Sequence, residues 1–159
     1  MNVVFCALGT TLKAAGSKER FLAIDHELLL SLAGKAREAG VRAFSYVSAS
    51  GADPGAWFFY NSVKGRNEQG LAALGFPVLH VMRPALLLTD REDSRPGERF
   101  AQCLAPAMDL LLPARYTSIP VSTVARSMIA EHISASASPP ATPISRVFEN
   151  DQIHLSGRP

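Results

Sequence analysis

Long apolar runs, paired cysteines and clusters of like charge are all scarce in this 159-residue sequence, and each scarcity excludes a class of protein. The longest apolar stretches, 28–33 and 85–88, fall far short of the roughly 20 residues that a membrane-spanning helix needs. The two cysteines, Cys6 and Cys103, lie far apart in apolar surroundings and lack the spacing of a zinc or redox motif. Both are expected to be reduced and buried.

Charge is balanced and evenly spread. The sequence holds 16 basic and 14 acidic residues, for a formal net charge of +2, so nothing favours a nucleic acid or an anionic membrane as partner. The four histidines share no spacing that would build a metal site, and no metal is predicted. Met1 is followed by a strand-like run, without a basic segment or an apolar signal core, which favours a cytoplasmic protein.

Alternating strand and helix patterns dominate the first half of the chain. Apolar runs at 3–8, 41–47 and 76–82 are typical of strands, and the first is continuous enough to be buried on both faces. Between them, 17–39 and 57–74 have helical periodicity, and Gly40 and Gly75 stop them. This order predicts an α/β fold in which a parallel sheet has helices on both faces. It matches the C-terminal half of a Rossmann-like domain.

The second half of the chain has a looser pattern. A polar loop is expected at 89–96, a helix broken near Pro106 at 100–112, and a further helix from Pro120 through Ile133. Residues 134–143 are rich in serine, alanine and proline, which predicts a linker. We therefore expect one domain over 1–133, a linker over 134–143 and a tail over 144–159 that contains a possible short strand.

Tyr60 and Lys64 are the residues most suggestive of chemistry. Four residues apart on a helix, they share one face, so the ammonium can lie near the phenol and favour its ionised form. A tyrosine in that setting can act as a general acid or base. Taken alone, such a pair is more often part of an ordinary helix surface.

Several short blocks together resemble the atypical short-chain dehydrogenase/reductase family, and within it the Tat-interacting-protein branch. The blocks are Cys6-Ala7-Leu8-Gly9-Thr10-Thr11, Ala15-Gly16-Ser17, Asp25, Ser48-Ala49-Ser50-Gly51-Ala52-Asp53, Tyr60-x-x-x-Lys64-Gly65, Arg83-Pro84, Asp90-Arg91, Ser94-Arg95-Pro96-Gly97-Glu98 and Glu149-Asn150. The resemblance covers roughly residues 3 to 132 and the tail. It implies an NAD(P)-dependent oxidoreductase acting on a small carbonyl or alcohol, with NADP or NAD as cofactor.

The resemblance also implies roles for individual residues. Tyr60 would exchange a proton with the substrate oxygen, Lys64 would lower the pKa of Tyr60 and bind the nicotinamide ribose, and Ser48 would hold the substrate oxygen. Ser50 is the alternative to Ser48, because the family's usual Ser-Ser pair is Ser48-Ala49 here. The cofactor would be bound by Leu8, Gly9, Thr10, Lys64, Pro84, Ala85 and Leu86.

One family feature is missing from the sequence: no G-x-G-x-x-G turn follows a strand anywhere. Relatives begin with that turn, and this chain starts at what would be their fourth strand, so an N-terminally truncated domain with compromised activity is expected. The 3–8 strand would then be an exposed edge. Either it pairs with another copy or with a separate polypeptide, or the chain is a truncated gene product or has a wrongly assigned start and folds poorly. The alternative function is a non-catalytic scaffold that binds protein partners through this edge.

Overall fold

A four-stranded parallel sheet forms the centre of the molecule. A computed structural model describes residues 1–88 and 113–158. The strand order is β1-β2-β3-β6, with every neighbouring pair parallel, as the sequence pattern predicted. The strands are β1 (Val3–Cys6), β2 (Ala43–Val47), β3 (Val78–Arg83) and β6 (Ile144–Glu149), and a separate parallel pair joins β4 (Leu87–Leu88) to β5 (Ile119–Pro120).

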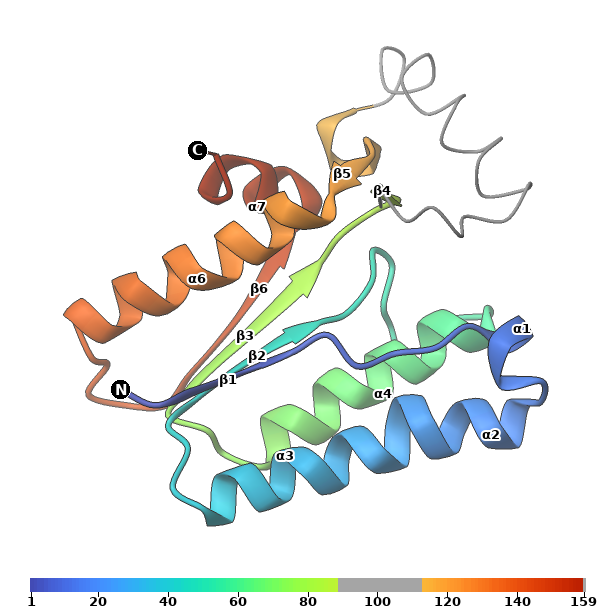
Figure 1. Cartoon of the computed structure of the whole chain (residues 1–159), viewed down its shortest axis with the longest axis horizontal. Helices are drawn as coiled ribbons and strands as arrows, with labels where there is room; N and C mark the ends of the chain where they lie inside the picture. The colour runs from blue at the N-terminus through green and yellow to red at the C-terminus, as the bar shows by residue number, and fades with distance from the viewer. Residues whose placement is uncertain (89–112, 159) are drawn as a thin grey trace.

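Helices cover both faces of the sheet (Figure 1). One face carries α2 (Lys18–Leu22), the π-helical η1 (Ala23–Leu28), α3 (Leu29–Glu38) and α4 (Phe59–Ala73). The other carries α6 (Val121–Ala137) and α7 (Asn150–Ser156). The short α1 (Leu12–Ala15) and the 3-10 turn η2 (Ala114–Tyr116) complete the elements. Each face has its own apolar core, one around Phe44 and Leu71, the other around Met82 and Ile153.

The helix predicted over 17–39 is continuous but not regular. Ser17 caps its start by accepting a hydrogen bond from the Arg20 amide, and Gly40 follows its end with a φ of 79°. In the middle, the six η1 residues have π-helical hydrogen bonding. Turns of this kind are rare and are frequent at functional sites. Here the π-helix carries Asp25, which is almost completely buried.

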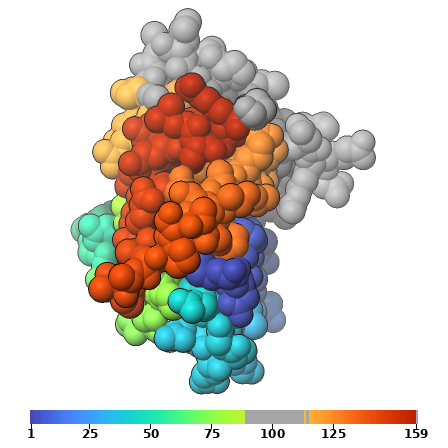
Figure 2. Space-filling view, turned by 90° about the vertical axis from the view of Figure 1, so that its left-hand side faces the viewer, coloured from blue at the N-terminus to red at the C-terminus, as the bar shows by residue number. Residues whose placement is uncertain are grey.

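Strand β1 is an edge of the sheet. It pairs with β2 alone among the described strands, which confirms the expected edge. It ends at Cys6 rather than Leu8, and it is not buried on both faces, because Phe5 remains 45% exposed. Cys6 is half-buried rather than buried, since no strand covers its outer side, and Cys103 lies outside the described residues. In Figure 2 the N-terminal segment lies at the surface beside α6, where the Phe5 ring packs edge-on against His132.

The C-terminal part differs most from expectation. Helix α6 continues to Ala137, so 134–137 are helical rather than part of a linker, because alternating serine and alanine permit a helix until Pro139. The following segment is no separate tail, since β6 pairs along its whole length with β3 and α7 packs on α6. A capping box between Glu149 and Gln152 starts α7. The loop expected at 89–96 and the helix expected at 100–112 lie outside the described residues.

His80 in β3 makes the fold sensitive to acid. Burial, together with the nearby charges of Arg146 and His132, lowers the pKa of His80 from 6.5 to about 4. Between those values the unfolded chain binds a proton that the folded chain does not, so stability falls as the pH falls from 6.5 to 4. We expect His80→Phe to remove about one proton from the pH dependence of the unfolding free energy in this window. Urea unfolding of wild type and His80→Phe at a series of pH values measures this dependence. The same slope of unfolding free energy against pH in both proteins would contradict the expectation.

Candidate functional site

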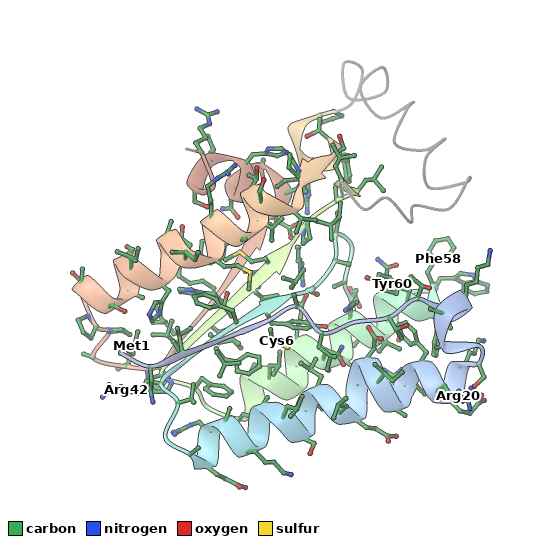
Figure 3. All side chains as sticks on the ribbon, viewed as in Figure 1. Met1, Cys6, Arg20, Arg42, Phe58 and Tyr60 are labelled. Carbon is green, nitrogen blue, oxygen red and sulfur yellow. The ribbon has the colours of Figure 1, made fainter. Side chains whose placement is uncertain are left out.

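The predicted site residues meet where the parallel strands end, the position at which open α/β sheets bind ligands. Gly9 and Thr10 follow β1, Ser48 and Ser50 follow β2, and Pro84 follows β3. The loops are tied together, because the Ser50 amide donates to the Pro84 carbonyl at 2.9 Å and the Asn61 side chain donates to the Ser50 carbonyl at 3.0 Å. Figure 3 shows Tyr60 and Phe58 at the start of α4, beside these strand ends.

Lys64 is a buried cation at the centre of the site, with 3% of its surface exposed. Its ammonium donates to the Tyr46 hydroxyl at 3.1 Å and lies 3.4 Å from the Asp25 carboxylate. It also lies 5.6 Å from the centre of the Tyr60 ring, so the structure brings the two motif residues together. A lysine on an ordinary helix surface would be solvated. Here the buried charge requires the partners that Asp25 and Tyr46 supply.

The phenol of Tyr60 differs in one respect from the prediction. Lys64 does act to lower its pKa, but burial acts more strongly, and the pKa of Tyr60 is raised above its ordinary value of 10. The nearby Tyr46 and Asp25 contribute to the rise. Tyr60 is therefore protonated at neutral pH.

Gly9 lies directly against the buried ion pair. A side-chain carbon at this position would lie 3.2 Å from the Asp25 carboxylate and 3.6 Å from the Lys64 ammonium. The neighbouring Thr10 amide donates to the same carboxylate at 2.7 Å. This part of the predicted cofactor site, Gly9 with Thr10 and Lys64, is thus brought together. A ligand group that approaches Gly9 would come close to the Lys64 ammonium.

Ser48 has a partner that sequence reasoning missed. Its hydroxyl donates to Glu68 at 2.5 Å, and Glu68 forms a two-point ion pair with Arg83, at 3.0 and 2.6 Å. Arg83 also binds Glu149 at 3.0 Å. A hydroxyl has one proton to donate, so Ser48 committed to Glu68 can offer a ligand only acceptor lone pairs. This commitment favours the alternative, Ser50, as the hydroxyl that donates to a substrate oxygen.

The remaining predicted cofactor residues are used mainly within the fold. The Ala85 amide donates to the Asn150 side chain at 2.9 Å, and the Leu86 carbonyl accepts from the Ile119 amide at 2.9 Å. Leu86 itself is 47% exposed at the strand ends, whereas Leu8 packs against the core. The Ala85 amide and the Leu86 carbonyl are thus engaged within the fold.

Several residues that build the site carried no role in the sequence analysis. Asp25 was noted only as part of a family block, while Tyr46, Asn67 and Glu68 were indistinguishable from core or surface residues. The spacing of Asn67 and Glu68, three and four residues after Lys64, was the available signal. Trp57 and Phe58, just before α4, are 96% and 73% exposed.

No group of three potential metal ligands gathers anywhere within residues 1–88 and 113–158. Over the same ranges, none of the helices combines the length and apolar character that crossing a membrane requires.

Curated relatives match the chain strongly over two thirds or more of its length. It is 43% identical over 107 residues to the mitochondrial protein fmp52 of Emericella nidulans, covering 67% of this chain and 46% of that protein. It is 38% identical over 128 residues to protein HTATIP2 of Rattus norvegicus, covering 80% of this chain and 52% of that protein. The chain thus spans about half the length of these curated relatives. No family model matches it.

Solved structures with the same fold include a UDP-galactose 4-epimerase and MoeE5. The chain superposes on a UDP-galactose 4-epimerase with a TM-score of 0.65 at 16% identity, covering 93% of this chain and 55% of that one. It superposes on MoeE5, solved with UDP-glucose and NAD, with a TM-score of 0.62 at 15% identity, covering 96% and 60%. At this identity the likeness shows the fold alone, a Rossmann-like architecture.

The comparisons correct one expectation and confirm another. The expected cytoplasmic location is wrong, because the Fmp52 relatives are named as mitochondrial proteins. The family resemblance drawn from the Tyr60 and Lys64 blocks is confirmed by the HTATIP2 match. The chain therefore belongs with the atypical short-chain dehydrogenase/reductase proteins typified by the Tat-interacting protein HTATIP2, over a region about half their length.

Proposed function

We propose that this chain forms the catalytic half of an NAD(P)-dependent oxidoreductase that reduces a small carbonyl compound. The observation that carries the proposal is the buried Lys64 ammonium beside the Tyr60 ring, at the carboxyl ends of parallel strands. Tyr60 supplies the proton that the substrate oxygen gains on reduction, and its raised pKa keeps that proton in place at neutral pH. Ser50 or Ser48 holds the same oxygen.

The cofactor fits the residues present. A bound nicotinamide dinucleotide supplies the hydride that reduces the carbonyl carbon. A ribose hydroxyl that approaches the backbone at Gly9, where no side chain intervenes, would lie beside Lys64 and Asp25, and Lys64 and the nearby Thr10 would hold it. A glycine-rich phosphate-binding turn occurs nowhere in this sequence. Dinucleotide binding by this chain alone is accordingly weaker than binding by an intact relative.

Titration with NADPH and then NADH tests the proposal. Nucleotide fluorescence is followed on the purified chain, with size-exclusion chromatography of the same sample. We expect weak saturable binding that Gly9→Leu abolishes, because its side chain fills the space beside Lys64, and that Tyr60→Phe leaves intact, because the phenol serves the substrate. Equal binding by wild type and Gly9→Leu would refute the assigned cofactor position. Absence of binding by a folded wild-type chain would refute function by this chain alone.

The open β1 edge favours a second candidate function, that of a scaffold which binds a protein partner by strand addition. Its backbone groups face no other described strand, and Phe5 beside them is 45% exposed. Tyr60→Phe distinguishes the two functions. An enzyme loses turnover in this variant, while a scaffold retains its partner.

The relatives also bear on location. The Fmp52 names support a mitochondrial location for this chain. Fractionation of cells that express the tagged protein tests it, with recovery outside the mitochondrial fraction as the contrary result.

A further inference from the structure

The side chain of Asn67, next to the candidate site, forms three hydrogen bonds. It is fully buried, with 0% of its surface exposed. Its amide nitrogen donates to the Asp25 carbonyl at 2.6 Å and to the Tyr46 hydroxyl at 3.0 Å. Its oxygen lies 2.6 Å from His26 Nδ1. Because the amide nitrogen is already the donor, the oxygen must accept, and His26 carries its proton on Nδ1.

These bonds connect the groups that contact Lys64. Asp25 lies on η1 and offers its carboxylate to the ammonium, and Tyr46 lies on β2 and offers its hydroxyl. Lys64 itself lies on α4, one turn before Asn67. The amide of Asn67 therefore joins both partners of the ammonium to the helix that carries it. A single side chain fixes the distances among three separate elements.

The geometry of η1 is consistent with this role. At Asp25 the carboxylate and the main-chain carbonyl both point to α4, the first to Lys64 and the second to Asn67. The carboxylate is held in turn by the Thr10 amide, next to Gly9. Tyr46 accepts from both Lys64 and Asn67, and burial raises the pKa of its hydroxyl, so it remains a neutral dipole. Each group at the ammonium thus has a second bond that holds it.

We propose that Asn67 is a positioning residue that holds the Lys64 ammonium in place at the candidate site. This proposal rests on the proposed function, because it is Lys64 at which Asn67 acts. Asn67 touches neither substrate nor cofactor in this scheme. It fixes Asp25 and Tyr46, and they fix the cation that lies beside Tyr60 and Gly9.

Amine labelling of the free chain tests the proposal without any nucleotide. The purified protein reacts with trinitrobenzenesulfonate, and mass spectrometry gives the labelling rate of Lys64 relative to the exposed Lys13 and Lys35. Asn67→Leu removes all three bonds without adding a charge. We expect it to raise the relative rate of Lys64 about tenfold, the effect of losing about 1.4 kcal/mol of hydrogen bonding.

Matched variants separate positioning from mere loss of stability. Leu71→Ala opens the core of the same helix without touching the network, and under conditions where both variants remain folded it should leave Lys64 protected. Equal labelling of Lys64 in Asn67→Leu and Leu71→Ala would overturn the proposal. Should Asn67→Leu fail to fold, Tyr46→Phe removes one hydroxyl from the same network; continued protection of Lys64 in that variant would also overturn it.

The labelling experiment and the dinucleotide titration can fail separately, so the two proposals can be told apart. If the chain binds no dinucleotide but Asn67→Leu releases Lys64, the oxidoreductase proposal fails while the positioning of Lys64 stands. If the chain binds dinucleotide and Lys64 remains protected in Asn67→Leu, the positioning proposal fails while the oxidoreductase proposal stands.

Discussion

Replacing Gly65 with alanine is expected to destabilise the chain by more than about 3 kcal/mol, the upper range for inserting a methyl group into a packed site. A side-chain carbon at Gly65 would lie 2.2 Å from the Pro54 nitrogen and 2.3 Å from the Asp53 carbonyl carbon. Both are backbone atoms, so neither can move aside without displacing the loop between β2 and α4. Gly65 is required for the close approach of α4 to that loop.

Gly34→Ala provides the matched control, since Gly34 also lies inside a helix but has open space around it. That change should stabilise the chain by about 0.5–1 kcal/mol, because alanine restricts the unfolded chain and favours the helix. Urea unfolding of both variants measures the change in unfolding free energy that each substitution causes. A stability for Gly65→Ala close to that of wild type would mean that the contact between α4 and the loop is looser than described.

Asp25→Asn is expected to cost about 3–5 kcal/mol, the range for removing one partner of a buried ion pair. The variant keeps the shape of the side chain but leaves the Lys64 ammonium, 3% exposed, without its counter-charge. Lys64→Met, which removes the charge and retains an unbranched side chain, leaves Asp25 buried in the same way. The double variant should be more stable than the sum of the single losses predicts, because no unpaired charge remains.

Denaturant unfolding of the four chains, wild type, both single variants and the double variant, gives the coupling energy. Strict additivity would show that Asp25 and Lys64 do not interact. The Lys64→Met chain also tests the electrostatics of Tyr60. Since Lys64 acts to lower the pKa of Tyr60, removing its charge should raise that pKa further, as measured by ultraviolet absorbance of the phenolate against a Tyr60→Phe reference.

The sheet and the position of the site were predictable because their signals are local and periodic. Continuous apolar runs fix β2 and β3, glycines end the helices before them, and the Tyr60 and Lys64 spacing places both on one helix face. The C-terminal end was harder. Serine and alanine at 134–137 do not distinguish a helix end from a linker, and only the register with β3 makes 144–149 a sheet strand.

The hydrogen bonds that link Asp25, Tyr46 and Asn67 around Lys64 were not predictable from the sequence, for a physical reason. Asp25, Tyr46 and Asn67 lie on three elements and meet only when the sheet and both helices have packed. The pattern of one helix does not indicate that a buried carboxylate on another element will balance the charge of its lysine. The same holds for the raised pKa of Tyr60, which depends on how much solvent the folded chain removes.

The open edge at β1 also restricts the symmetry of any assembly built on it. Two identical copies related by a two-fold axis would have to place their β1 strands side by side in opposite directions. Such a dimer would have a continuous sheet whose two halves are each parallel but whose central seam is antiparallel. A strand that instead extends the parallel order must come from a different segment or polypeptide. The direction of the strand that pairs with β1 would therefore distinguish two-fold self-association from the addition of a different segment or polypeptide.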